Sequence, residues 1–446
     1  MSNLLKDMMA KRRVGVPCGV PSYCTANELV IEALLRQGMR FDEGILIEAT
    51  ANQVNQFGGY TGMLPADFRD FVYEIADRVG YPKEKIVLGG DHLGPLTWAD
   101  EPEETAMAKA EELVRLFVLA GYKKIHLDTS MRLADDSREE ALSDETIARR
   151  GARLYRVCEE AYQQLKKDNP AEERPVYIVG SEVPIPGGAQ EEEDSVAVTK
   201  PEAAARTIQV YQEQFEKAGM KDAFENVIGI VVQPGVEFGD DDVFHYNSYK
   251  ATQLCEELRK YDGVVMEGHS TDYQSPTGLR QMVADGIAIL KVGPALTFAL
   301  RTGMFALEQI ERRLFPEAEW TNFEAVLENE MLENPGKWKN YYRGTEQEIA
   351  MKRRFSFSDR CRYYFAQPAV QAAMERLVDH VGSADIPLGL LYQYMPVQYA
   401  KVRDGVLSKS ARDLVMDFVV EEAEHYNFAT RYGYVPSGEY APIPMQ

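Results

Sequence analysis

Short runs rich in β-branched residues alternate with helical segments along most of the chain, and this alternation limits the possible folds most strongly. Each run is apolar in its body and ends in polar residues or glycine. The segments between the runs have the apolar period of amphipathic helices, and several end at the glycine that commonly follows a helix. The eight runs are 14–20, 44–50, 85–91, 124–130, 176–182, 227–233, 263–269 and 288–294.

Eight strand–helix units in succession predict an α/β protein with a TIM (β/α)8 barrel. The alternation stops near residue 316, and the remaining segments are helical and rich in aromatic residues. We therefore expect a barrel domain at 1–315 and a helical C-terminal extension at 316–446. The aromatic residues of the extension either form its core or line a substrate mouth or a subunit interface.

The chain is acidic, with a formal net charge of −22 over 446 residues. Nucleic-acid binding needs a basic surface that releases counterions from the phosphates, so no nucleic-acid partner is expected. No stretch approaches the length of apolar sequence that a membrane span needs, and the first residues do not resemble a signal peptide. A soluble cytoplasmic protein is therefore predicted. The acidic runs 191–194 and 240–242 are interpreted as solvated loops.

The five cysteines are an odd number without a CxxC pair, which is typical of a reducing compartment. Cys18 and Cys24 lie near a predicted strand end, where a nucleophile is conceivable. No histidine or basic residue is assigned to either thiol, so we interpret both as buried or incidental.

Polar side chains gather at the C-terminal ends of the predicted strands. The βα loops of a barrel meet on one face, and the active site of such a barrel lies there. The clustering predicts a mouth that binds a metal and transfers protons. The residues concerned are Glu48, Asp91, His92, His126, Asp128, Glu182, Gln233, Glu267, His269 and Lys291.

A divalent metal in such a mouth takes imidazole and carboxylate ligands from different strands and keeps one position open for substrate. His126 is interpreted as a core histidine rather than a ligand. Zinc is the first expectation because it suits mixed imidazole and carboxylate ligation, and Mn²⁺, Ni²⁺ and Mg²⁺ are alternatives. The candidate metal ligands are His92, Glu182, Glu267, His269 and the weaker oxygen donor Gln233.

Acid–base residues are predicted beside the metal. Asp91 precedes His92 and is the expected base for a substrate hydroxyl, since it need not be a ligand itself. Glu182 or Asp128 is expected to assist as a second acid or base.

A phosphate site is predicted at the same face. In such barrels the loops after strands seven and eight often hold a phosphate on backbone N–H groups. Lys291 adds charge there unless it points into the barrel, and Glu48 binds substrate unless it bonds to neighbouring backbone. The candidate substrate-binding and phosphate-binding residues are Glu48, Ser270, Thr271, Lys291 and Gly293, followed by the helix that begins near Ala295.

Several segments carry a resemblance that spans nearly the whole chain. They include LIEATANQVNQFGGYTGM (46–63), LGGDHLGP (88–95), GHSTDYQ (268–274) and DIPLGLLYQYMPVQ (385–398). These segments closely resemble the Z-type subunit family of class II D-tagatose-1,6-bisphosphate aldolase, which is also labelled tagatose-6-phosphate kinase. The resemblance implies a TIM barrel of class II aldolase type.

The resemblance also implies a catalytic carboxylate and a metal ligand at Asp91 and His92. Class II aldolases have further metal-binding histidines after strands six and seven, where this chain has QPG (233–235) and EGH (267–269). The altered metal set argues against plain bisphosphate aldolase activity. Glu182, together with the carboxylate and imidazole of EGH, is expected to replace the missing imidazoles.

Two functions follow from the resemblance. We predict a metal-dependent 4-epimerase that interconverts fructose 6-phosphate and tagatose 6-phosphate, or the free sugars, by breaking and re-forming the C3–C4 bond. The alternative is a non-catalytic subunit that stabilises a separate tagatose-bisphosphate aldolase subunit. A homo-oligomer or a complex with that subunit is expected. The chain contains neither GxxxxGK[ST] nor GxGD, so the sequence does not favour the kinase label.

Overall fold

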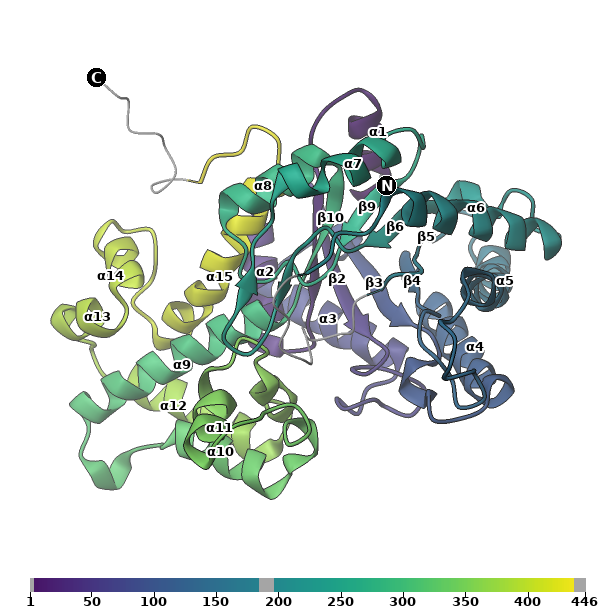
Figure 1. Ribbon diagram of the computed structural model, residues 1–446. Helices are drawn as coiled ribbons and strands as arrows, with labels where there is room; N and C mark the ends of the chain where they lie inside the picture. The colour runs from purple at the N-terminus through teal and green to yellow at the C-terminus, as the bar shows by residue number, and fades with distance from the viewer. Residues whose placement is uncertain (1–3, 184–195, 437–446) are drawn as a thin grey trace.

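Eight parallel strands of the described residues close into a barrel, in the spatial order β1-β10-β9-β6-β5-β4-β3-β2 (Figure 1). The computed structural model describes residues 4–183 and 196–436. The predicted TIM barrel is confirmed. The strands are β1 Val20–Cys24, β2 Ile45–Thr50, β3 Ile86–Leu93, β4 Lys124–Leu127, β5 Val176–Val179, β6 Val227–Val232, β9 Val265–Gly268 and β10 Ile287–Val292. A short antiparallel pair, β7 Glu237–Phe238 and β8 Val243–Phe244, follows β6.

Helices lie on the outside of these strands (Figure 1). Several begin where a side chain accepts a backbone N–H of the first turn, as Asn27, Ser143 and Ser275 do. Two end at glycines in the left-handed region, Gly80 with φ 76° and Gly286 with φ 114°. These helices are α2 Glu28–Gly38, α3 Pro65–Val79, α4 Glu103–Leu119, α5 Asp144–Asp168, α6 Pro201–Lys217, α7 Ser248–Leu258, α8 Pro276–Asp285 and α9 Pro294–Leu314.

The predicted helical extension is also confirmed. Its last helix returns to the barrel and packs against α2, α8 and α9, so the extension and the barrel share one buried apolar cluster. The division at residue 315 stays a prediction. The helices of the extension are α10 Phe323–Glu333, α11 Glu346–Phe355, η6 Arg360–Tyr364, α12 Pro368–Gly382, α13 Leu388–Tyr394, α14 Pro396–Arg403 and α15 Ala411–Thr430.

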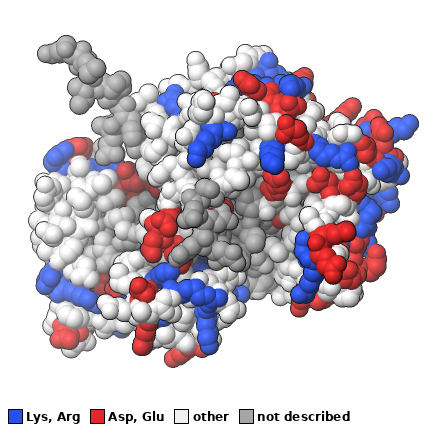
Figure 2. Space-filling view, viewed as in Figure 1, with Lys and Arg blue, Asp and Glu red and all other residues white. Residues whose placement is uncertain are grey.

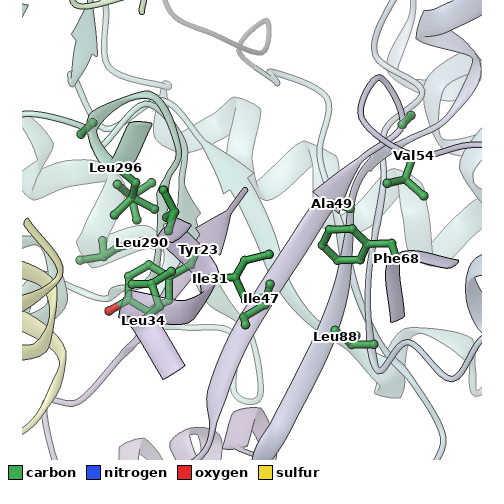
Figure 3. Close-up of a cluster of buried hydrophobic side chains, with 14 of the residues drawn as sticks. Tyr23, Ile31, Leu34, Ile47, Ala49, Val54, Phe68, Leu88, Leu290 and Leu296 are labelled. Carbon is green, nitrogen blue, oxygen red and sulfur yellow. The ribbon is translucent and has the colours of Figure 1, made fainter. Parts of the chain in front are cut away.

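The apolar core lies between the strands and the surrounding helices. Figure 3 shows one part of it, where Ile47 of β2 lies beside Ile31 of α2. Tyr23, Leu34 and Leu290 belong to the same buried cluster. Because this layer buries the outward-facing side chains of the strands, the inward-facing ones are free to carry polar groups.

The first strand begins later than the sequence predicts. Residues 14–20 were expected as the strand, but β1 starts at Val20. Gly15 has φ 84° and ends the preceding helix α1, Leu4–Arg13. The Gly19 N–H donates to the carbonyl of Thr430 instead of to a neighbouring strand. This part of the chain is therefore bonded to α15, which a local pattern does not reveal.

Helix α1 fills the N-terminal end of the barrel. Its Leu5 and Met8 are buried in a cluster with Leu46, Val87 and Ile289 of the strands. The interior at this end is apolar, whereas the polar residues of the strands lie towards the other end.

The predictions made for the two acidic runs have different outcomes. The run 191–194 lies outside the described residues. In 240–242, between β7 and β8, the prediction of solvated charge is wrong for Asp240. Its carboxylate accepts a hydrogen bond from Ser356 at 2.9 Å and pairs with Lys352 at 3.0 Å. Asp240 thus ties the β7–β8 hairpin to the extension.

On the face drawn in Figure 2, Lys and Arg are interspersed with Asp and Glu. Among the helices of the described residues, none is both long and apolar enough to cross a membrane.

Candidate metal centre and active site

A cavity of about 750 Å³ opens among the C-terminal ends of the strands and the extension. Asp91, His92, His269 and Lys291 line it from the barrel, and Arg362 lines it from η6. The strand ends and the extension therefore form the walls of one open cavity.

Four buried residues at this mouth form a group that could hold a metal ion, Asp91, His92, His126 and His269. Each offers one ligand atom, and these atoms all lie within 4.8 Å of one another. The three imidazole rings converge, with centroid separations of 4.8 Å, 5.0 Å and 5.2 Å.

Carboxylates hold two of the imidazoles in place. His92 Nδ1 lies 2.8 Å from Asp128 Oδ2, and His269 Nε2 lies 3.0 Å from Glu267 Oε1. An ionised carboxylate only accepts, so each of these nitrogens carries the hydrogen. His92 Nε2 and His269 Nδ1 are then the nitrogens with free lone pairs.

The third imidazole has the same arrangement. His126 Nδ1 lies 2.9 Å from Asp91 Oδ1 and 3.1 Å from the amide nitrogen of His92. The shorter contact, to an ionised carboxylate, is made by the tautomer with hydrogen on Nδ1, whereas the second contact, in which the His92 N–H points to Nδ1, suits hydrogen on Nε2. We assign the first tautomer, because the carboxylate is the charged partner. His126 Nε2 is buried and has no hydrogen-bond partner among the described residues. An unpartnered buried nitrogen is costly unless it binds something else, such as a metal.

These residues fit a divalent metal. Three imidazoles, each with one nitrogen on a carboxylate and the other left for a ligand, form the kind of donor set found in a catalytic metal site that keeps a position open for substrate. Burial lowers the pKa of His92, but Asp91 and Asp128 outweigh it and raise the pKa above its usual value, so a metal would displace a proton from this ring. Zinc, nickel and manganese accept imidazole ligands. The fit rests on the convergence of the three rings and on the unpartnered Nε2 of His126.

The end of β3 is shaped for this site. The pairing of β3 with β4 shifts register between Gly90 and Leu93, and His92 in this bulge has φ 48°. A bulge re-aims side chains, and a non-glycine residue in the left-handed region often marks a functional position. At Gly89 a Cβ atom would lie 2.6 Å from Glu48 Oε1, so glycine leaves room for that carboxylate inside the barrel.

A buried network of charges lies next to the metal group. Lys124 is fully buried and contacts Glu48 at 2.7 Å and Glu267 at 2.8 Å. Lys291 pairs with Glu48 and lies 2.7 Å from Asp91 Oδ2. If one side chain left this network, the charge of its partner would stay buried and unpaired, which is costly. The network therefore fixes the positions of its members.

This network keeps Asp91 ionised. Burial alone would raise the pKa of the Asp91 carboxyl, but the neighbouring His92 and Lys291 outweigh it and hold the pKa well below its usual range. The carboxylates around Lys291 likewise outweigh burial and raise its pKa well above its usual value. The mouth thus presents a carboxylate and an ammonium group in contact, both in their charged forms at neutral pH.

His269 remains neutral at physiological pH. Burial lowers its pKa to about 4, although the hydrogen bond with Glu267 acts in the opposite direction. The neutral form is the one that binds metals.

This lowered pKa predicts a pH-dependent stability for the metal-free protein. Between about pH 6.5 and pH 4 the unfolded chain takes up a proton on His269 that the folded chain does not, so this residue makes stability fall as the pH falls. We expect the loss of unfolding free energy from pH 7 to pH 5 to be smaller in His269→Gln than in wild type by about 2 kcal/mol. Urea unfolding with chelator at both pH values measures it. His245→Gln, at an exposed histidine, is the control. Equal pH dependence in wild type and His269→Gln would contradict the neutral buried imidazole.

Two predicted ligands are not brought to the metal group. Glu182 lies in the segment after β5 and is exposed. Gln233 follows β6, and its Oε1 accepts N–H bonds from Gly235 at 2.9 Å and Val236 at 3.0 Å, which makes it part of a turn. Their predicted roles as ligands receive no support from this geometry and stay predictions.

Two other predicted residues lie behind the metal group. Glu267 and Asp128 contact ring nitrogens of His269 and His92, so they hold ligands in position. Of the two cysteines interpreted as buried or incidental, Cys18 is buried, whereas Cys24 is half-buried and lines the cavity. Burial raises the pKa of the Cys24 thiol well above its usual value. All five cysteines are free.

The predicted phosphate-binding groups are mostly bonded already. The Thr271 hydroxyl donates to the Lys291 carbonyl at 2.6 Å. The N–H groups of Gly293 and Ala295 donate to Asp272 Oδ1 at 3.0 Å and 2.9 Å. The carboxylate of Asp272 thus takes the place at the start of α9 that a phosphate was expected to take.

Ser270 retains its predicted position. It has φ 52° and lines the cavity beside His269.

The sequence of β4 contained a signal for the side to which His126 points. Lys124, His126 and Asp128 alternate along KIHLD, and alternate residues of a strand point to one face. The structure buries Lys124 between two carboxylates of the interior, and the alternation then places His126 and Asp128 on the same side. The interpretation of His126 as a plain core residue overlooked this register.

Comparison with known proteins gives consistent matches over nearly the whole chain. Residues 5–431 match the D-tagatose-1,6-bisphosphate aldolase subunit GatZ/KbaZ-like family. The chain is 44% identical over 424 residues to the D-tagatose-1,6-bisphosphate aldolase subunit GatZ of Salmonella paratyphi B, which covers 95% of this chain and 98% of the relative. The crystal structure of a probable tagatose 6 phosphate kinase from Sinorhizobium meliloti 1021 has a TM-score of 0.84 and 46% identity, covering 93% of this chain and 100% of that one. The resemblance inferred from the sequence segments is confirmed.

Proposed function

The chain belongs to the D-tagatose-1,6-bisphosphate aldolase subunit GatZ/KbaZ-like family, and from this premise we propose that it is a metal-dependent enzyme that inverts C4 of a ketose or ketose phosphate. The proposed pairs are fructose 6-phosphate with tagatose 6-phosphate, or fructose with tagatose. One observation supports this most strongly: three imidazoles with free nitrogens converge beside the ionised carboxylate of Asp91 in one cavity.

The chemistry of the substrate explains why such a site is needed. C4 of a 2-ketose is not adjacent to the carbonyl, so its hydrogen is not acidic and simple proton removal cannot invert it. Cleavage of the C3–C4 bond avoids this difficulty. The C4 hydroxyl loses its proton and becomes an aldehyde, while the electron pair of the broken bond passes to C3 and the C2 carbonyl. When bound, the divalent metal supplies Lewis-acid stabilisation of that negative charge.

Asp91 is the proposed base. Its carboxylate is ionised and buried at the cavity wall, so it can accept the proton of the C4 hydroxyl and return it after the aldehyde has turned its other face to C3. Lys291, 2.7 Å from Asp91 Oδ2, holds the carboxylate in position and offers a positive charge to the C4 oxygen. Asp128 and Glu267 keep the imidazoles in the tautomers that bind a metal.

The cavity wall suits a reaction with a free intermediate. Tyr363, Phe365 and Met374 of the extension line the cavity together with the strand ends. A space of about 750 Å³ is large enough to retain both fragments while one turns over. These apolar side chains keep water from the part of the wall that they cover.

Zinc is the first metal we propose, because imidazole nitrogens suit it, with Mn²⁺, Ni²⁺ and Mg²⁺ as alternatives. We also propose a cytoplasmic location, in line with the free cysteines.

A second candidate function is that of a stabilising subunit, with no catalysis of its own. The printed name of the Salmonella relative describes it as an aldolase subunit, which favours a complex with a separate aldolase chain. A homo-oligomer is the other assembly we propose. The carboxylate–imidazole pairs favour the catalytic function over that of a stabilising subunit. Burying charged groups costs free energy, and a subunit without catalysis would gain nothing from them.

The test uses the purified full chain alone. After treatment with chelator and reloading with Zn²⁺, Mn²⁺, Ni²⁺ or Mg²⁺, we expect interconversion of fructose 6-phosphate and tagatose 6-phosphate with at least one metal and none without. Light scattering on the same samples gives the assembly state. A chain that is inactive with every metal and yet raises the activity of a separate tagatose-bisphosphate aldolase subunit would favour the second candidate.

A further inference from the structure

Three lysine or arginine side chains of the described residues line the cavity, Lys291, Arg362 and Arg412. Lys291 pairs with carboxylates of the barrel interior, Glu48 among them, and Arg412 pairs with Glu32. Each therefore already has a protein carboxylate as partner, and Arg412 shares Glu32 with Arg36 and Arg78. A bound anion would gain little from either.

Arg362 differs from the other two. No carboxylate of the described residues lies within 4.0 Å of its guanidinium nitrogens. Nη1 donates to the backbone carbonyls of Ser358 and Asp359, the latter at 3.0 Å, and Nη2 donates to the Tyr363 hydroxyl at 2.9 Å. A guanidinium has five N–H donors, so Nε–H and one Nη2 hydrogen are left without an acceptor in the described residues.

The surrounding residues hold this guanidinium in place. Asp359, three residues earlier in the chain, pairs with Arg301 of α9 at 3.0 Å, and both side chains are almost fully buried. The ring of Tyr363 packs against Tyr60 of the barrel, with centroids 5.0 Å apart. Because η6 is anchored to the barrel at both points, Arg362 keeps a fixed position at the cavity wall.

We propose that Arg362 binds the phosphate of the substrate, so that the preferred ketose is a phosphorylated one. The sugar chemistry rests on the proposed function, whereas recognition of the phosphate rests on the guanidinium alone. An arginine with an adjacent pair of free N–H donors binds a phosphate through two parallel hydrogen bonds. The anion site at the start of α9 is already taken by Asp272, which leaves Arg362 as the cation for this role in the described part of the cavity.

On this proposal the barrel and the extension bind different parts of the substrate. The barrel supplies Asp91 and the imidazoles, and the extension supplies the phosphate-binding arginine. A free ketose would occupy the metal group but leave Arg362 unpaired. Selectivity for the phosphorylated sugar is the consequence.

The test is the replacement Arg362→Met, with Lys337→Met as the matched control. Lys337 lies 5.9 Å from the Tyr60 ring and 5.8 Å from the Tyr363 ring, but it is exposed and does not line the cavity. Calorimetry measures binding of inorganic phosphate and fructose 6-phosphate to metal-loaded protein. In Arg362→Met we expect both dissociation constants to rise about 10- to 100-fold, as for a lost charged hydrogen-bonded pair. Lys337→Met is expected to bind both as wild type does.

The activity assay separates the phosphate site from the proposed function. In Arg362→Met, kcat/KM for fructose 6-phosphate is expected to fall by a similar factor while kcat/KM for free fructose is unchanged, and Arg362→Lys is expected to recover part of the loss. Arginine-dependent phosphate binding in a chain without epimerase activity would support the site and overturn the proposed function. Unchanged phosphate affinity in a folded Arg362→Met or Arg362→Gln variant of an active enzyme would overturn the site and leave the function standing.

Discussion

Asp91→Asn is expected to lower the turnover of fructose 6-phosphate to tagatose 6-phosphate by about 100-fold or more, the usual contribution of a general base. An amide cannot accept the proton of the C4 hydroxyl at neutral pH. The metal should remain bound, because the carbonyl of the asparagine can still accept the hydrogen bond from His126 Nδ1 that now goes to Asp91 Oδ1 at 2.9 Å. Lys291 keeps its other partner, Glu48.

Initial rates at saturating metal measure the turnover, and elemental analysis measures how much metal remains bound. Asp100→Asn makes the same chemical change at an exposed position and is expected to retain wild-type rates. If Asp91→Asn keeps wild-type turnover with metal bound, Asp91 is not the base. If it loses the metal as well, its main role is to hold His126.

The barrel and part of the site could be predicted because both depend on local patterns. Apolar runs with polar ends mark the strands, and the topology of a closed barrel then brings those ends together. Asp91, His92 and His269 were expected at one mouth for this reason, and the structure places all three in the group that could hold a metal.

The roles of other site residues depend on which hydrogen-bond partner each side chain reaches in the folded chain. Asp272 follows the predicted phosphate loop directly, but only the folded chain shows its carboxylate bonded to the Gly293 and Ala295 N–H groups. The amide of Gln233 is likewise used within its own turn. A residue type at a strand end indicates what chemistry is possible there, while the neighbouring donors and acceptors decide whether it is free to act.

Arg362 was not predicted because its position is set by tertiary packing. It lies in the extension, far in sequence from every strand, and reaches the cavity because η6 is tied to α9 by the pair of Asp359 and Arg301. Helix α15 then packs the extension against α8 and α9. No period or motif in this region indicates which of its arginines faces the barrel mouth.

His126→Ala is expected to remove the metal from the protein as effectively as His92→Ala does. Like the other two imidazoles, His126 has one nitrogen on a carboxylate, and its Nε2 is buried without a hydrogen-bond partner in the described part of the chain. Loss of residues that merely orient a ligand weakens metal binding about 10- to 100-fold, and loss of a ligand should exceed that. Elemental analysis after dialysis and competition with a chelator measure occupancy and affinity, and circular dichroism verifies that the variants fold. His245→Ala, at an exposed histidine, should keep the metal of the wild type.

A core histidine would give the opposite pattern, in which His92→Ala loses the metal while a folded His126→Ala retains it at full stoichiometry. That pattern would return His126 to a packing role and leave His92, His269 and Asp91 as the ligands.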